Sequence, residues 1–101
     1  MIYFIGAGPG DPDLVTVKAQ KILQIADAVL FTGSLVPKEV LFWCKSEAII
    51  EDSQSMKYPE IFDFLVKHKD KIVARVHTGD PSIYSTIAKQ IEFLKEQNIE
   101  Y

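Results

Sequence analysis

A glycine–aspartate–proline triplet occurs twice in this 101-residue chain, each time between a short apolar run and a segment of helical periodicity. The first copy, residues 10–12, ends a glycine-rich stretch that begins at Gly6, and the second copy is residues 79–81. Glycine permits a tight turn and a close approach of the backbone to a ligand, while aspartate accepts hydrogen bonds. Helix capping, with proline in the first helical turn, explains either copy alone but not the glycine density of the first. The two turns therefore predict contact with a ligand.

The charges around the glycine-rich stretch exclude the common nucleotide-binding loops. The third glycine of the dinucleotide-binding pattern would fall at Asp11, whose carboxylate would repel a diphosphate, and no acid follows residues 28–31 to hold a ribose. The Gly-Lys-Ser/Thr sequence of a P-loop is also missing after the glycines. The turns favour a ligand that is not a polyanion, such as a cationic or zwitterionic nucleoside, with Asp80 available to accept a hydrogen bond.

Composition and charge exclude several other classes of protein. Eleven lysines and arginines stand against 14 acids, giving a net charge of −3, and the cations are scattered, so we expect no nucleic-acid partner. A hydrophobic fraction of 48% is enough for a folded core. The single cysteine, Cys44, predicts neither a disulfide nor a metal site and favours the reducing cytoplasm. No leader peptide and no apolar run near the ~20 residues of a membrane span are present, so no membrane association is expected.

Short apolar runs alternate with amphipathic segments along the chain. The runs predict strands covered on both faces at residues 2–5, 28–31, 48–50 and 72–76. The segments between them predict helices over residues 14–26, 59–69 and 82–97 and a short helix over 37–44. This order predicts an α/β fold with a mainly parallel sheet of four to five strands and helices on both faces. Ligands of such a sheet bind at the carboxyl ends of its strands.

Three further expectations concern single positions. Asn98 is expected to end the last helix, and residues 99–101 to approach a fifth strand, so that the chain would be part of a larger protein. Strand alternation places Arg75 and His77 on one face of the sheet. His68 stands between two lysines and is expected to be a solvated helix residue.

The chain resembles the tetrapyrrole (corrin/porphyrin) methylases, which use S-adenosylmethionine, over its whole length. Residues 6–19 and 76–84 match the two N-terminal signatures of that family. Residues 30–36 and 52–56 make the resemblance closest to the precorrin-4 and cobalt-precorrin-4 C-11 methyltransferases of cobalamin synthesis. The resemblance implies two α/β domains with the cofactor between them, residues 1–101 being the N-terminal domain and the second domain being absent from this chain. It also implies a cytoplasmic homodimer with a tetrapyrrole substrate.

The resemblance further implies roles for individual residues. The residues expected to line S-adenosylmethionine, which becomes S-adenosylhomocysteine, are Pro9, Thr78, Gly79, Asp80 and Ile83. From their place in the expected topology, Ser34, Ser55, Met56 and His77 are expected to contact substrate, although residues 53–56 could equally be an ordinary polar connection. Because the sulfonium is already an activated methyl donor, alignment and exclusion of water suffice, and no catalytic residue is assigned.

Several alternatives stay open at this point. His77 could take a proton as a general base, although a hydrogen-bonding role in shaping the cleft or contacting substrate is favoured. The chain could belong to another corrin-pathway methyltransferase, or the isolated chain could be an inactive folding or dimerisation module. A precorrin carries several carboxylates, so local groups such as Lys38, Lys57 or Arg75 would have to offset the acidic balance of the chain.

Overall fold

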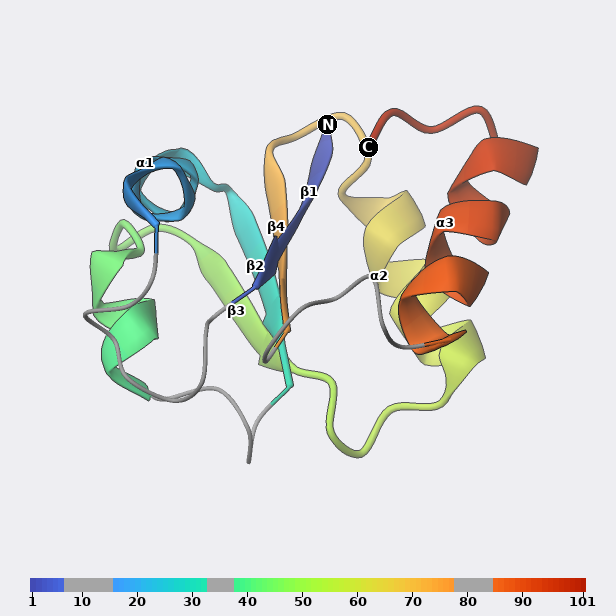
Figure 1. Cartoon of the computed structure of the whole chain (residues 1–101), viewed down its shortest axis with the longest axis horizontal. Helices are drawn as coiled ribbons and strands as arrows, with labels where there is room; N and C mark the ends of the chain where they lie inside the picture. The colour runs from blue at the N-terminus through green and yellow to red at the C-terminus, as the bar shows by residue number, and fades with distance from the viewer. Residues whose placement is uncertain (7–15, 33–37, 78–84) are drawn as a thin grey trace.

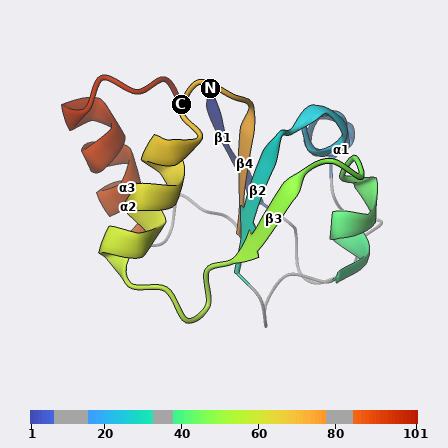
Figure 2. The same ribbon diagram turned by 180° about the vertical axis from the view of Figure 1, so that it is seen from behind.

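Four parallel strands form one sheet between two layers of helices. The computed structural model describes residues 1–6, 16–32, 38–77 and 85–101. Its elements are β1 (Ile2–Gly6), α1 (Val17–Ile25), β2 (Ala28–Phe31), the 3₁₀ helix η2 (Lys38–Trp43), β3 (Ile49–Asp52), α2 (Tyr58–Lys67), β4 (Val73–His77) and α3 (Ser85–Glu96). The strand order is β1-β4-β2-β3 and every pairing is parallel. Helix α1 and η2 cover one face, and α2 and α3 cover the other (Figures 1 and 2). The predicted α/β class is confirmed.

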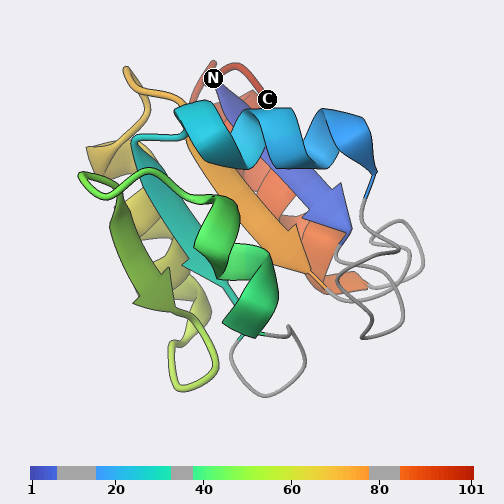
Figure 3. The ribbon, with the colours of Figure 1, turned by 90° about the vertical axis from the view of Figure 1, so that its left-hand side faces the viewer.

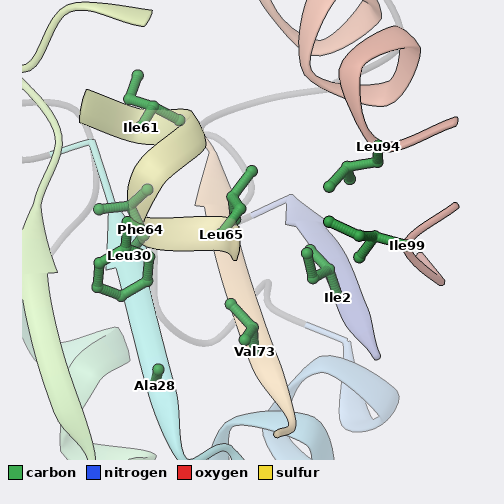
Figure 4. Packing of buried hydrophobic residues seen from close by; sticks show 9 residues of the cluster. All are labelled: Ile2, Ala28, Leu30, Ile61, Phe64, Leu65, Val73, Leu94 and Ile99. Carbon is green, nitrogen blue, oxygen red and sulfur yellow. The ribbon is translucent and has the colours of Figure 1, made fainter. Parts of the chain in front are cut away.

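Each face of the sheet has its own apolar core because successive strand residues point to opposite sides. On β2, Val29 packs toward α1 and η2, whereas Ala28 and Leu30 pack toward α2 and α3. Figure 4 shows the second core, in which Leu65 of α2 lies between the strands and the last helix. Residues 73–77 of β4 are buried throughout, as expected for a central strand.

The range and the burial of the third strand differ from the prediction. Residues 48–50 were expected to be covered on both faces, but β3 runs over Ile49–Asp52 and all four of its residues are exposed. The reason is its position: β3 pairs only with β2, at the edge of the sheet. Burial on both faces applies to β4, which has a neighbour on either side.

The expectation that His68 is solvated is wrong. Helix α2 ends at Lys67, two residues before the predicted end, and His68 is its C-cap. The imidazole is only 4% exposed and lies 4.6 Å, centroid to centroid, from the ring of Phe64. Burial lowers the pKa of His68 below its usual value, and the neighbouring Lys67 and Lys71 act in the same direction. The flanking lysines therefore gave no information about the histidine between them.

The two ends of the described chain lie close together (Figures 1 and 2). Asn98 has a φ of 55°, the left-handed conformation expected of a residue that ends a helix. After this turn the backbone N–H of Ile2 donates to the carbonyl of Glu100 over 3.1 Å, so residues 99–101 return to β1 without forming a fifth strand among the described residues. Within the described ranges, none of the helices has both the length and the apolar character needed to cross a membrane.

Truncating Leu65 tests the core between the sheet and α2. Its side chain is completely buried, and we expect Leu65→Ala to lower the free energy of unfolding by about 2–5 kcal/mol because it removes apolar contacts and leaves a cavity. The measurement is urea denaturation followed by circular dichroism. Val66→Ala is the control, because the adjacent Val66 is 37% exposed and should lose much less. Equal losses in both variants would contradict this packing.

Candidate active site

Both predicted ligand turns begin at the same edge of the sheet. Gly6, the last residue of β1, is the register partner of His77, the last residue of β4. Figure 3 shows the four strands running in the same direction toward this edge. The predicted cofactor residues Pro9, Thr78, Gly79, Asp80 and Ile83 lie outside the described residues, as does Ser34. The structure therefore shows where these two turns leave the sheet, and the roles of the residues within them stay predictions.

A cavity of about 520 Å³ lies at the same edge, on the side covered by α2 and α3. Its described lining includes two cations, Arg75 and Lys57, and no carboxylate. Of the predicted substrate residues, Met56 and His77 line it together, whereas Ser55 is exposed and is not among the described lining residues. The remaining described lining residues are Thr32, Ser53, Gln54, Tyr58, Ile61 and Gln90.

Arg75 places a buried positive charge beside this cavity. The side chain is 3% exposed; its Nε donates to Gln90 Oε1 over 3.1 Å and its Nη1 donates to the carbonyl of Leu30 over 3.3 Å. Burial lowers the pKa of Arg75 to about 10, so the guanidinium remains charged at neutral pH. Both acceptors are uncharged, and the only ion pair among the described residues is between Lys45 and Asp27.

His77 is buried beside Arg75 and is neutral. Its ring stacks on Phe4 with centroids 6.0 Å apart, and its Nε2 atom is buried without a hydrogen-bond partner in the described structure. Burial, followed by the positive charge of Arg75, lowers the pKa of His77 to about 3. A general base works best when its pKa is near the working pH, so this environment favours the hydrogen-bonding role over the base.

The segment between β3 and α2 is fixed against the end of β2. The backbone N–H of Ser53 donates to the carbonyl of Phe31 over 2.7 Å, and its hydroxyl donates to the same oxygen over 3.1 Å. Tyr58 begins α2 at the cavity, and Lys89 Nζ lies 5.0 Å from the centroid of its ring. Ser53 is thus anchored to the end of β2, and Lys89 is a third cation close to the cavity, besides Lys57 and Arg75.

Sequence reasoning missed Gln90 and Tyr58 as lining residues. Gln90 is 1% exposed and precedes the fully buried Leu94 by four residues on α3, which places both on the buried face of the helix. A glutamine at such a position needs a polar partner inside the protein, and that was the available signal. No comparable signal exists for Tyr58, because an aromatic residue in a first helical turn is equally consistent with ordinary packing.

A parallel α/β sheet with a cavity at its carboxyl edge, lined by two cations and no described acid, is typical of ligand-binding α/β domains. The family model of the Tetrapyrrole (Corrin/Porphyrin) Methylases matches residues 1–101. The chain belongs to this family.

Among the described residues, no group of three or more histidine, cysteine or acidic side chains is arranged to hold a metal ion.

Curated relatives in several organisms are similar over nearly the whole chain. The chain is 44% identical to the cobalt-precorrin-4 C(11)-methyltransferase of Methanocaldococcus jannaschii, covering 98% of this chain and 39% of the relative. It is 42% identical to the precorrin-4 C(11)-methyltransferase of Rhodococcus erythropolis, covering 99% and 41%. It is 40% identical to the uroporphyrinogen-III C-methyltransferase of Bacillus subtilis, covering 99% and 42%. The chain therefore spans about two fifths of the length of these relatives.

Solved structures of methyltransferases are similar to this chain in backbone as well as in sequence. The crystal structure of a cobalamin biosynthetic enzyme, cobalt precorrin-4 methyltransferase, superposes with a TM-score of 0.91 at 42% identity, covering 97% of this chain and 42% of that one. The uroporphyrin-III C-methyltransferase of Thermus thermophilus, complexed with S-adenosylhomocysteine, gives a TM-score of 0.79 at 32% identity, covering 97% and 41%. The fold is that of the N-terminal part of both enzymes.

The neutral state of His77 has a measurable consequence for stability. Its pKa lies at about 3 in the folded chain against 6.5 in the unfolded chain, so the unfolded state binds the extra proton between these values. Stability is therefore present above pH 6.5 and falls as the pH decreases toward 3, by up to about 1.4 kcal/mol per pH unit. The lowered pKa of His68 adds a loss of the same sign.

Urea denaturation at a series of pH values measures this dependence. We expect His77→Asn to flatten the decrease in stability below pH 6.5 because it removes the titrating group. His68→Asn removes the other histidine and measures the part of the decrease that His68 contributes. Two-dimensional ¹H–¹⁵N NMR of the imidazole nitrogens should show a neutral His77 ring at pH 5. A ring that protonates near pH 6.5 would contradict the buried environment.

Proposed function

We propose that this chain is the N-terminal domain of an S-adenosylmethionine-dependent methyltransferase that methylates precorrin-4 or cobalt-precorrin-4 at C-11 in cobalamin synthesis. The observation that supports this most directly is the similarity to the cobalt-precorrin-4 and precorrin-4 enzymes along the whole chain, in sequence and in backbone structure. The reaction transfers a methyl group from sulfur to carbon. S-adenosylmethionine, when bound, supplies that methyl group in activated form.

The pairing of β1 with β4 supports a cofactor site at the edge where these two strands end. Because Gly6 and His77 are register partners, the two glycine–aspartate–proline turns start from adjacent strands and can hold a single ligand between them. In this proposal Pro9 and Ile83 supply apolar contacts, and Thr78, Gly79 and Asp80 hydrogen-bond the cofactor. The similarity to a methyltransferase structure that contains S-adenosylhomocysteine supports the same assignment.

The cavity on the α2 side supplies the corresponding place for a tetrapyrrole. It adjoins the end of β4 that leads to the second turn, and its described charges are positive although the whole chain carries −3. Met56 and His77 would contact the substrate there, with Ser34 and Ser55 at its periphery. The protein's contribution to the reaction is then to orient the acceptor carbon and to exclude water, as expected when the methyl donor is already activated.

The relatives are about two and a half times as long as this chain, so a complete enzyme would need more than residues 1–101. We propose that a second α/β domain closes the cleft, that the complete enzyme is a cytoplasmic homodimer without a nucleic-acid partner, and that the isolated chain has little activity. Strand β3 is an exposed edge strand, and this domain lines the proposed site from one side only. Both features are consistent with a domain that is part of a larger enzyme.

A second candidate differs in the position that is methylated. The 40% identity to a uroporphyrinogen-III C-methyltransferase is close to the values for the C-11 enzymes. This favours keeping another corrin-pathway or uroporphyrinogen methylase as the alternative. The higher structural similarity to the cobalt-precorrin-4 enzyme favours C-11.

Cofactor binding is tested by calorimetric titration of the complete protein with S-adenosylhomocysteine. We expect saturable binding that Asp80→Ala weakens about tenfold or more, because a charged hydrogen-bond acceptor is lost, and that Pro9→Ala weakens to a smaller extent. Asp63→Ala, an exposed position on α2, makes the same chemical change away from the site and should have no effect. Unchanged affinity in both site variants would remove this cofactor assignment.

Substrate choice is tested by mass-spectrometric turnover. The complete protein is offered precorrin-4, cobalt-precorrin-4 and uroporphyrinogen III with S-adenosylmethionine, and the methylated position is read by NMR of a ¹³C-methyl product. We expect methylation at C-11 of one or both precorrins and none of uroporphyrinogen III. Methylation of uroporphyrinogen III alone would establish the alternative, and the 101-residue chain assayed in parallel reports the activity of this domain by itself.

A further inference from the structure

Arg75 carries a buried charge that the described protein does not neutralise. Its two hydrogen bonds go to Gln90 Oε1 and to the carbonyl of Leu30, both uncharged, and no described carboxylate lies within salt-bridge distance of the guanidinium. Buried charges in proteins are normally paired, since an unpaired one keeps the full cost of leaving water. Arg75 therefore needs a counter-charge that the described residues do not provide.

The surroundings of Arg75 provide room for that anion. The residue lines the cavity of about 520 Å³, where the other described charge, Lys57, is also positive. His77 lines the same cavity two residues further along β4 and has a buried Nε2 without a described partner. In its neutral form an imidazole can donate one ring proton, which a carboxylate oxygen accepts. One cation and one unpartnered polar nitrogen, both more than nine-tenths buried, therefore stand on the same side of the same strand.

We propose that Arg75 and His77 form a subsite that binds one carboxylate of the ligand. This rests on the proposed function, which brings two sources of that group to the site: a side chain of the tetrapyrrole, or the amino-acid end of the cofactor. Arginine suits this role because its planar guanidinium can offer two parallel N–H groups to a carboxylate. Gln90 and the Leu30 carbonyl hold the guanidinium in place, so Gln90 is a positioning residue.

Gln90→Glu is the most informative variant. It keeps the size of the side chain and an oxygen that accepts from Arg75 Nε, but it supplies the missing negative charge from within the protein. If the ligand carboxylate normally neutralises Arg75, the new glutamate competes with it, and affinity should fall about tenfold or more. Gln24→Glu adds the same charge at an exposed position on α1, across the sheet, and is the matched control.

Three probes, titrated by calorimetry into the complete protein, identify the source of the carboxylate. Uroporphyrin III is a stable tetrapyrrole with carboxylate side chains, S-adenosylhomocysteine has the amino-acid carboxylate, and 5′-methylthioadenosine lacks it. Weaker binding of uroporphyrin III to Gln90→Glu assigns the subsite to the tetrapyrrole, and weaker binding of S-adenosylhomocysteine, but not of methylthioadenosine, assigns it to the cofactor. Both results support the subsite, whichever tetrapyrrole and ring position the enzyme methylates.

Other results would overturn the proposal. The proposal is wrong if Gln90→Glu and Gln24→Glu bind both carboxylate probes with equal affinity. It is also wrong if Gln90→Glu loses as much affinity for methylthioadenosine as for the carboxylate probes, or if neither carboxylate probe binds the parent protein. A measurement on the unmodified protein keeps the test valid if the variant folds poorly. The Nε–H NMR signal of Arg75 should shift on addition of the bound carboxylate probe and not on addition of methylthioadenosine; an unchanged signal contradicts the proposal.

Discussion

The buried guanidinium of Arg75 is the constraint on which the carboxyl edge of this domain depends. A charge can stay inside a protein only where polar groups replace its water, and here the backbone of β2 and the side chain of Gln90 do so in part. These two contacts connect three elements, because Arg75 belongs to β4, Leu30 to β2 and Gln90 to α3. The spacing between the sheet and α3 near the cavity is therefore set by a polar contact as well as by the apolar core beneath it. Neither of these contacts neutralises the charge.

Most of the fold follows from periodicity in the sequence, and the errors have physical causes. Apolar runs of four or five residues located β1, β2 and β4 to within one residue, because those strands are covered by helices on both faces. For the edge strand β3, the predicted range was shifted and the predicted burial was wrong. The burial of a strand depends on which strands pair with it, and the residues of the run alone do not reveal the pairing. His68 was misjudged for a related reason: its ring packs against Phe64 on the buried side of α2, and the polar neighbours of His68 in the sequence conceal this.

The candidate site was predictable in position but not in composition. Parallel topology placed any ligand at the carboxyl ends of the strands, and strand alternation placed Arg75 and His77 on one face, which the structure confirms. Gln90 and Tyr58 come from helices that approach the site only after folding, so motif spacing could not include them. Three features of these residues likewise appear only in three dimensions: their burial, the uncharged partners of Arg75, and the lack of a described hydrogen-bond partner for His77 Nε2.

Local arrangement also reconciles the acidic net charge of the chain with the anionic substrate of the proposed function. Net charge governs long-range attraction, but inside a cavity the nearest charges dominate because little water remains to screen them. The described cavity lining holds Arg75 and Lys57 and no acid, whereas many of the chain's carboxylates lie on outer helix faces, as Asp63 does. A carboxylate-bearing ligand of the proposed function would therefore meet a locally positive surface, although the chain as a whole is acidic.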